Sequence, residues 1–203
     1  MKPFKFLLFV IFLSPIVFNS CAGPSHAVTR LSVDEDRDLS GRWNDTDSRL
    51  VAEQMIDALL THQWLGNFIT QEDKNPVLIV GDVRNLSSEH IPVDIFIKDI
   101  ERELINSGQV SFVANKFERE EVRAERLDQQ LSATEETAKR LAAETGADFM
   151  LRGSLKNQVD AISGKKIKFY QVDLELIDLE TNAKVWLETK KIKKLVKQPK
   201  ASW

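Results

Sequence analysis

The amino-acid sequence predicts an α/β fold: a single domain with a small mixed β-sheet flanked by about four helices. Three observations lead to this expectation. Helical and strand patterns alternate along the first half of the chain, which is typical of parallel strands joined by crossover helices. Strands with clean polar and apolar alternation follow towards the C-terminus, which is typical of an antiparallel meander with one packed face. Apolar residues make up 42% of the chain and charged residues 29%, and both are values of a globular protein.

The first half of the domain is predicted to contain two helices and two strands. The first helix begins at Thr46 or Asp47, either of which can cap it through a side-chain oxygen, and it ends near His62. The second helix has Pro92 in its first turn, where proline is favoured, and stops at Gly108. The strands are the short apolar runs at 77–80, closed by Gly81, and 110–114. A loop is expected between the first helix and the first strand.

The second half is predicted to contain two more helices and three strands. A charged helix spans 117–131, and another begins at Ser132, because Ser132 and Glu135 have the spacing of a capping box, and ends at Gly146. The strands are expected at 149–155, 167–177 and 184–192. In the second of these, Tyr170 to Leu176 alternates with polar residues, so one face packs and the other contacts water.

The N-terminus has the layout of a bacterial lipoprotein signal peptide. Lys2 and Lys5 precede an apolar segment that ends at Phe18, and Cys21, the only cysteine, follows Ser20. The apolar segment is shorter than the roughly 20 residues that cross a bilayer. An ordinary secretory peptide cut elsewhere would leave a free thiol instead. We expect lipidation of Cys21, and because Ala22 is not an aspartate, the outer membrane as its destination.

These signals divide the chain into four parts. Residues 1–20 are the expected signal peptide, 21–45 a lipid-anchored flexible tether, 46–198 the globular domain and 199–203 a C-terminal tail. The net charge of -3 gives no overall attraction to nucleic acid, so no nucleic-acid partner is predicted.

The sequence offers no catalytic set, cofactor motif or metal site. His26, His62 and His90 lack the spacing of metal ligands, and a glycine-rich phosphate loop is absent. Ser154 after Gly153 lies within a predicted strand, so a serine nucleophile is not favoured. Asp82 and Asp148 are expected to make hydrogen bonds at strand ends. The chain is therefore predicted not to be an enzyme.

Two charged segments have alternative interpretations. Asp34, Asp36, Asp38 and Asp45 partly follow the pattern of a calcium-binding loop, but the required glycine is replaced by Leu39, so a solvated acidic tether is favoured. The C-terminal lysines from Lys190 to Lys200 could contact anionic lipid or an acidic partner, or they could protect an edge strand from unwanted pairing. The second interpretation is favoured.

Candidate partner-binding residues lie next to the first helix and after the first strand. Trp43 and Trp64 flank the helix, where an aromatic side chain either covers the edge of the core or anchors a partner. Two segments that follow strands, 84–91 and 156–166, are candidate recognition loops. Arg84 and Asn85 begin the first of them. Trp203 is a further possible anchor, although a disordered terminus is favoured there.

Several segments together resemble the LpoB family of outer-membrane lipoproteins. They are Leu39-Ser40-Gly41-Arg42-Trp43 with the residues up to Arg49, Val80 to Asn85, Thr145 to Ser154, and the hairpin from Asp173 to Trp186. The resemblance covers about residues 39–195 and includes Cys21. The last two segments also resemble related domains of curli-secretion lipoproteins and of TolB. The tether is shorter and contains less proline than those of family members known to cross the periplasm.

The resemblance implies a mixed sheet flanked by helices, no enzyme activity, and an outer-membrane anchor that faces the periplasm. It also implies a partner, a bifunctional penicillin-binding protein, which the chain would activate. We expect the chain itself to be a monomer. The alternative is an outer-membrane secretion or assembly lipoprotein related to curli-type components. A wall hydrolase is a third hypothesis, which the lack of a paired acid and base disfavours.

Overall fold

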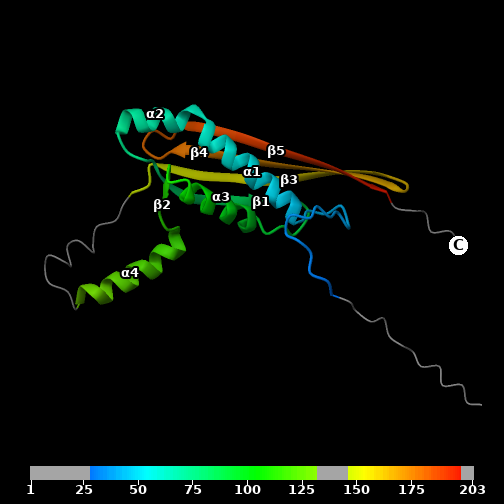
Figure 1. Ribbon diagram of the computed structural model, residues 1–203, viewed down its shortest axis with the longest axis horizontal. Helices are drawn as coiled ribbons and strands as arrows, with labels where there is room; N and C mark the ends of the chain where they lie inside the picture. Colours follow the sequence, from blue (N-terminus) through cyan, green and yellow to red (C-terminus); the bar gives the residue numbers. More distant parts are fainter. Residues whose placement is uncertain (1–27, 132–145, 198–203) are drawn as a thin grey trace, which may run out of the picture. The chain divides into compact units, whose positions relative to one another are not determined.

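The computed structural model describes residues 28–131 and 146–197. From Asp34 onwards the chain forms one compact unit, separate from the unit that contains residues 1–33. In the described part of that unit, four helices and five strands follow one another as shown in Figure 1. They are α1 Asp45–Thr61, α2 Gln63–Glu72, β1 Val77–Asn85, α3 Asp94–Asn106, β2 Ser111–Phe112, α4 Lys116–Leu131, β3 Phe149–Ile162, β4 Lys165–Asp178 and β5 Lys184–Lys197. The predicted α/β class, with a mixed sheet and about four helices, is confirmed.

The five strands form one mixed sheet in the order β2-β1-β3-β4-β5. β1 pairs in parallel with both β2 and β3, and the β3-β4-β5 meander is antiparallel. The predicted combination of early parallel crossovers and a late meander is therefore correct. The register of β1 on β3 shifts between Val80 and Val83, so Gly81 lies within the strand instead of closing it as we predicted.

The core lies between one face of the sheet and helices α1 and α3. Its fully buried side chains include Met55 and Leu59 of α1 and Phe96 and Ile100 of α3. Along β4, Tyr170, Val172, Leu174 and Leu176 are buried, and the residues between them are half-buried. Burial thus follows the alternation in the sequence, and the face away from the core carries Gln171, Asp173 and Glu175.

The start of α1 is fixed by a reciprocal cap. The Asn44 side chain accepts from the Asp47 backbone N–H at 3.1 Å, and the Asp47 carboxylate accepts from the Asn44 N–H at 3.0 Å. Two of the amides that a helix leaves without partners are satisfied in this way. Asp47 is therefore the third residue of the helix, and the predicted capping role of Thr46 or Asp47 belongs to Asn44.

Two expectations about secondary structure were wrong. The segment 63–72, expected as a loop, is helix α2, which is capped by the His62 side chain and packs Trp64 and Leu65 into the core. The segment 156–166, expected as a recognition loop, is the continuation of β3, a turn at Ser163 and Gly164, and the start of β4. The predicted helix at 132–146 falls almost wholly outside the described residues, as does the expected signal peptide.

Candidate functional site

Trp43 joins the segment before α1 to the core of the domain. Its indole lies edge-on to Tyr170, with ring centroids 5.5 Å apart, and tilted against Phe96 at 6.2 Å. The indole N–H donates to the Ser48 hydroxyl at 2.9 Å. These contacts correspond to the core-covering alternative for Trp43, although the ring stays partly exposed.

Below Trp43, a buried ion pair links α1 to β5. The Lys194 ammonium donates to the Asp47 carboxylate at 2.6 Å, and the two side chains are only 8% and 3% exposed. Lys194 also donates to Asp38 at 2.6 Å and to the Arg42 carbonyl at 3.2 Å. Burial raises the pKa of Asp47 above its usual range, although the hydrogen bond from Lys194 opposes this shift.

A second polar cluster surrounds Glu89, which follows β1. Its carboxylate accepts from Lys168 at 2.7 Å, from the Tyr170 hydroxyl at 2.9 Å and from the Trp43 backbone N–H at 3.3 Å. Burial alone would raise the pKa of Glu89, but the hydrogen bonds from Lys168 and Tyr170 outweigh burial and lower it. Burial and the neighbouring Glu89 raise the pKa of the Tyr170 phenol.

We call residues 38–47 together with Glu89, Lys168, Tyr170 and Lys194 the polar seat. It holds the last part of the predicted tether against β4 and β5. Gly41 adopts a φ of +64°, and a Cβ at this position would collide with the Val196 side chain, which explains the glycine in this segment.

The other predicted binding residues are not part of this seat, although Asn85 contacts the backbone of Glu89. Trp64 is 6% exposed, lies edge-on to Phe149 and donates its indole N–H to the Leu59 carbonyl at 3.0 Å. It is thus a core residue. Asn85 shapes the loop after β1, because its side chain donates to the carbonyls of Glu89 and Ile91 and accepts from Ser87.

Arg84 is the predicted binding residue with the most accessible side chain. It is 55% exposed at the end of β1 and lies 3.5 Å from Asp82, itself 75% exposed. The prediction of strand-end hydrogen bonding holds for Asp148, which accepts from the Val77 N–H at 2.8 Å and from Lys74 at 2.9 Å. Asp82 instead forms the exposed ion pair with Arg84.

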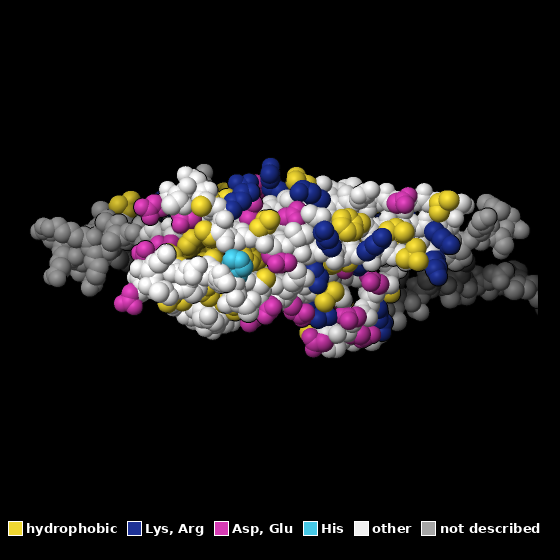
Figure 2. Space-filling model, turned by 90° about the horizontal axis from the view of Figure 1, so that it is seen from above, with side chains coloured by type: hydrophobic (Ala, Val, Ile, Leu, Met, Phe, Trp, Pro, Cys, Tyr) yellow, Lys and Arg dark blue, Asp and Glu magenta, His cyan; other side chains and the backbone are white. Residues whose placement is uncertain are grey.

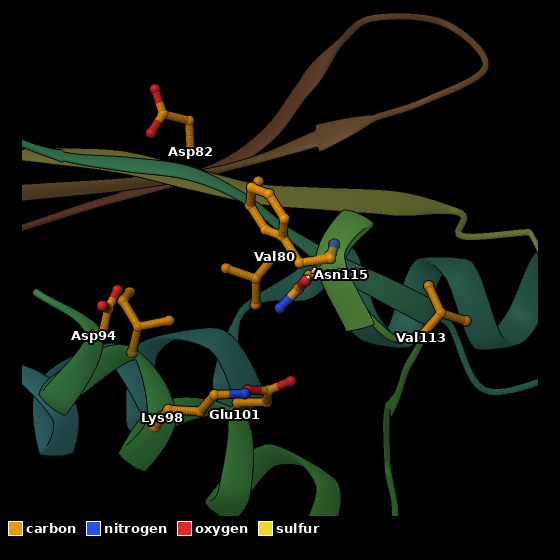
Figure 3. Close-up of a pocket in the computed structure, with 10 residues that line it drawn as sticks. Val80, Asp82, Asp94, Lys98, Glu101, Val113 and Asn115 are labelled. Atoms are coloured by element: carbon orange, nitrogen blue, oxygen red, sulfur yellow. Dashed lines mark hydrogen bonds and ion pairs between the residues drawn. The ribbon is translucent and has the colours of Figure 1, made fainter. Parts of the chain in front are cut away.

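A cleft of about 650 Å³ lies between β1, α3 and the segment from β2 to α4. Figure 3 shows Val80 and Asn115 pointing towards it from above and Lys98 and Glu101 rising from α3 below. Lys98 bridges Glu101 at 2.6 Å and Glu118 of α4 at 3.4 Å. The cleft therefore has an apolar wall that includes Val80, Ile97 and Val113, and a rim of mixed charge.

Phe117 lies at the edge of this cleft and was not singled out as a site residue from the sequence. Its side chain is 77% exposed in the first turn of α4. The Asn115 side chain caps this turn by accepting from the N–H groups of Phe117 and Glu118, and Glu118 accepts from the Asn115 N–H in return. The signal in the sequence was a phenylalanine at the start of a helix that is otherwise strongly charged.

The described residues contain no cluster of metal-ligating side chains. In residues 28–131 and 146–197, no three His, Cys, Asp or Glu side chains are placed to hold a metal ion. Asp36 and Asp38 of the calcium-like pattern pair with Arg49 and Lys194 instead of converging. Within the same ranges, no helix is long and apolar enough to cross a membrane.

The fold and the site define the class of protein as a mixed α/β domain with an open cleft, in which the segment before α1 is held in a polar seat. The particular family follows from the sequence. The model of the family described as peptidoglycan-synthase activator LpoB matches residues 47–192, which is well over half of the chain. The chain therefore belongs to the LpoB family. That family is regulatory, its members are lipoproteins of the cell envelope, and it acts on penicillin-binding proteins.

Solved structures of this family resemble the chain at low sequence identity. The C-terminal domain of LpoB from Salmonella enterica is 16% identical, with a TM-score of 0.36, and the match covers 63% of this chain and 91% of that domain. The equivalent domain from Escherichia coli is also 16% identical, with a TM-score of 0.36, and the match covers 64% of this chain and 98% of that domain. A longer structure of E. coli LpoB is 12% identical, with a TM-score of 0.33, and the match covers 98% of this chain and 96% of that one. None of the curated proteins compared with the chain matched it significantly.

Proposed function

We propose that the protein is a lipid-anchored, non-catalytic regulator that binds a bifunctional penicillin-binding protein and raises its activity. The observation that carries this proposal is the family match over residues 47–192, which spans α1 to α4 and most of the sheet. The signal-like N-terminus with Cys21 supports an anchor in the outer membrane, facing the periplasm. To activate the synthase, the chain must bind its active conformation more tightly than its inactive one.

The cleft beside Phe117 is our candidate for the synthase-binding surface. Interface hot spots are commonly aromatic side chains that enter or flank a pocket, and Phe117 is both highly exposed and adjacent to the cleft. The surrounding ion pairs of Lys98 would form a polar rim. Arg84 and the partly exposed edge of Trp43 remain predicted contacts outside the cleft, whereas burial argues against Trp64.

The test compares Phe117→Ala with Leu127→Ala in a glycan-polymerisation assay. The penicillin-binding protein comes from the same cell, and the regulator is titrated. Leu127 is a matched control because it is also an exposed apolar residue of α4, at 61%, and does not line the cleft. Loss of a hot spot worth about 2 kcal/mol should raise the half-maximal concentration of Phe117→Ala about 30-fold, and Leu127→Ala should match the wild type.

Two results would count against these proposals in different ways. If the wild-type protein neither bound nor stimulated any synthase of the cell, the regulatory function would be rejected. If Phe117→Ala stimulated normally, only the cleft would lose its role. A large detergent-stable ring of copies, instead of the expected monomer, would support the secretion hypothesis.

A further inference from the structure

The three long strands extend beyond their pairing with β1 and form an arm that carries an unusual outer face. β1 ends where Asn85 pairs with Leu155, and from there β3, β4 and β5 pair only with one another to the end of the sheet (Figure 1). We define the arm as residues 156–171 and 190–197. Its outer face is the side opposite the buried Lys168, Tyr170 and Lys194.

Cross-strand register identifies the residues of this outer face. Residues paired directly across strands share a face, so the rows can be taken from the pairing. They are Lys156, Gln171 and Lys191, then Gln158, Phe169 and Lys193, then Asp160, Ile167 and Leu195, and finally Ile162, Lys165 and Lys197. Each of these side chains is exposed or half-buried.

Large apolar side chains and lysines alternate across this face. Ile162 is 77% exposed and Leu195 57%, and Ile167 and Phe169 lie between them on the central strand. Lysines occupy both sides of this apolar strip, and Asp160 is the one acid of the rows. In the right-hand part of Figure 2, over the end of the strands, Lys and Arg side chains likewise lie among hydrophobic ones.

The pattern exceeds what protection of an edge strand requires. Lysines on β5 would discourage strand pairing, but Lys165 lies on the central strand β4, and exposed Ile162 and Leu195 work against solubility. Two lysines of the inner face behave differently, because Lys168 is paired with half-buried Glu89 and Lys194 with buried Asp47. Within the described residues, Lys165, Lys191, Lys193 and Lys197 have no ion-pair partner.

We propose that the outer face of the arm lies on the surface of an anionic phospholipid bilayer. Lysines around large apolar side chains are the combination that binds a membrane interface, since the ammonium groups meet lipid phosphates while the apolar groups enter the acyl boundary. A single lipid modification with a basic surface is also a common two-signal anchor.

The length of the chain places the arm within reach of the anchoring membrane. This step rests on the proposed lipidation of Cys21. Asp38 to Gly41 line a hollow together with Lys193 to Lys197, so the chain enters the polar seat beside the arm. The roughly 16 residues from Ala22 to Arg37 span at most about 54 Å, and on average about 22 Å if flexible. The membrane that holds the acyl chains is therefore the nearest large surface available to the arm.

The test uses the mature lipoprotein in vesicles and a fluorescent label at Ile162→Cys. Cys21 is the only native cysteine, so once it is acylated the introduced thiol is the single labelling site. Vesicles contain nitroxide-labelled lipid in phosphatidylcholine, with or without phosphatidylglycerol. We expect the label to be quenched in vesicles that contain phosphatidylglycerol. The quenching should disappear in vesicles of phosphatidylcholine alone, and also in high salt, because salt screens the charge of the lysines. A label at Glu180→Cys, an exposed residue of the opposite turn of β4 and β5, should remain unquenched.

Matched charge variants show whether the outer face is responsible. The triple substitution Lys165→Gln, Lys193→Gln and Lys197→Gln should abolish quenching at position 162. The control removes the same charge from exposed residues elsewhere, Lys74→Gln, Arg102→Gln and Lys184→Gln, and should leave quenching intact. Equal quenching of both labels, or no response to phosphatidylglycerol, would overturn the proposal. So would a response only to an added acidic peptide, because the occupant would then be a protein.

The outcome is separable from that of the proposed function. The lysine triple variant should still stimulate the synthase in detergent micelles, where no bilayer is present. Quenching without any stimulation by the wild type would reject the regulatory function alone. Stimulation without quenching would reject membrane docking alone.

Discussion

Replacement of Lys194 by methionine tests whether the polar seat depends on a buried charge pair. Methionine keeps most of the volume of the lysine stem but removes the ammonium that faces Asp47, whose side chain is 3% exposed. Breaking a buried pair by removing one partner costs about 3–5 kcal/mol, because the remaining charge is left without compensation. The added contact with Asp38, which is 56% exposed, contributes little to this sum.

Urea unfolding followed by tryptophan fluorescence measures this loss. Trp43 and Trp186 both lie in or beside the core and should report global unfolding. Lys193→Met is the matched control, since Lys193 is the exposed neighbour on the opposite face of β5, and it should change the free energy of unfolding by less than about 0.5 kcal/mol. A loss below about 1 kcal/mol for Lys194→Met would refute the argument that the pair is buried and coupled.

The pH dependence identifies the cause of the loss. Burial already raises the pKa of Asp47, and removal of Lys194 takes away the main opposing contact, so the pKa rises further. A carboxyl group whose folded pKa lies above its unfolded value binds protons more readily when folded, and stability therefore falls as the pH rises through that interval. The deficit of Lys194→Met should thus shrink in mildly acidic solution, and an added Asp47→Asn should recover part of it at neutral pH. A deficit that does not change with pH would point to lost packing.

Two further predictions concern the core and the sheet. Glu89→Gln should cost about 1.5–3 kcal/mol in urea unfolding at neutral pH, because Lys168 loses a charged partner. Since its surroundings lower the pKa of Glu89, the advantage of the wild type should vanish as the pH falls through that lowered pKa, and a constant difference would contradict this. Gly153→Ala places a Cβ against the Asp173 carbonyl oxygen and should cost more than about 2 kcal/mol. The control is Gly66→Ala in α2, where the added Cβ meets open space, so this substitution should instead stabilise the protein by about 0.5–1 kcal/mol. If both substitutions shifted the melting temperature equally, the close spacing of β3 and β4 would be refuted.

The sequence contains a helical pattern for α2 that our prediction did not use. Trp64, Leu65, Phe68 and Ile69 have helical spacing, and His62 supplies a side-chain cap. We nevertheless expected a loop there. Only His62 separates the segment from α1, and neither a proline nor a glycine marks the place where the second helix begins. Its end was equally hidden, since Asp73 adopts the left-handed conformation that usually favours glycine, with φ of 51°.

The lengths of β3, β4 and β5 could not be predicted for a different reason. The alternation from Tyr170 to Leu176 is strong because α1 and α3 cover one face of the sheet there. Residues 156–166 are exposed or half-buried on both faces, so most of their side chains are polar and the segment resembles a loop. Pairing with the neighbouring strands holds these residues extended, and single-strand patterns do not report such long-range contacts.

The polar seat could not be predicted from the sequence either, because it also depends on long-range contacts. Asp47 and Lys194 are separated by 147 positions, and in sequence each resembles an ordinary surface charge. For Trp43 the sequence left two alternatives, covering the core or binding a partner, and the contacts of its ring with Tyr170 and Phe96 favour the first. Fold class follows from local periodicity, whereas the site depends on which distant charges are buried together.

The polar seat also bears on how far the regulator can act. Because Asp38 and Asp47 are bound to Lys194, the domain holds the predicted tether from residue 38 onwards and not from residue 45. On the proposed anchor at Cys21, about 54 Å is then the upper limit from the membrane to the seat. A tether this short keeps the effective concentration of the domain high near the anchoring membrane and close to zero beyond its span. Activation of an inner-membrane synthase would therefore require the synthase itself to extend towards the outer membrane, so that its reach, more than the affinity of the cleft, would decide which enzyme is regulated.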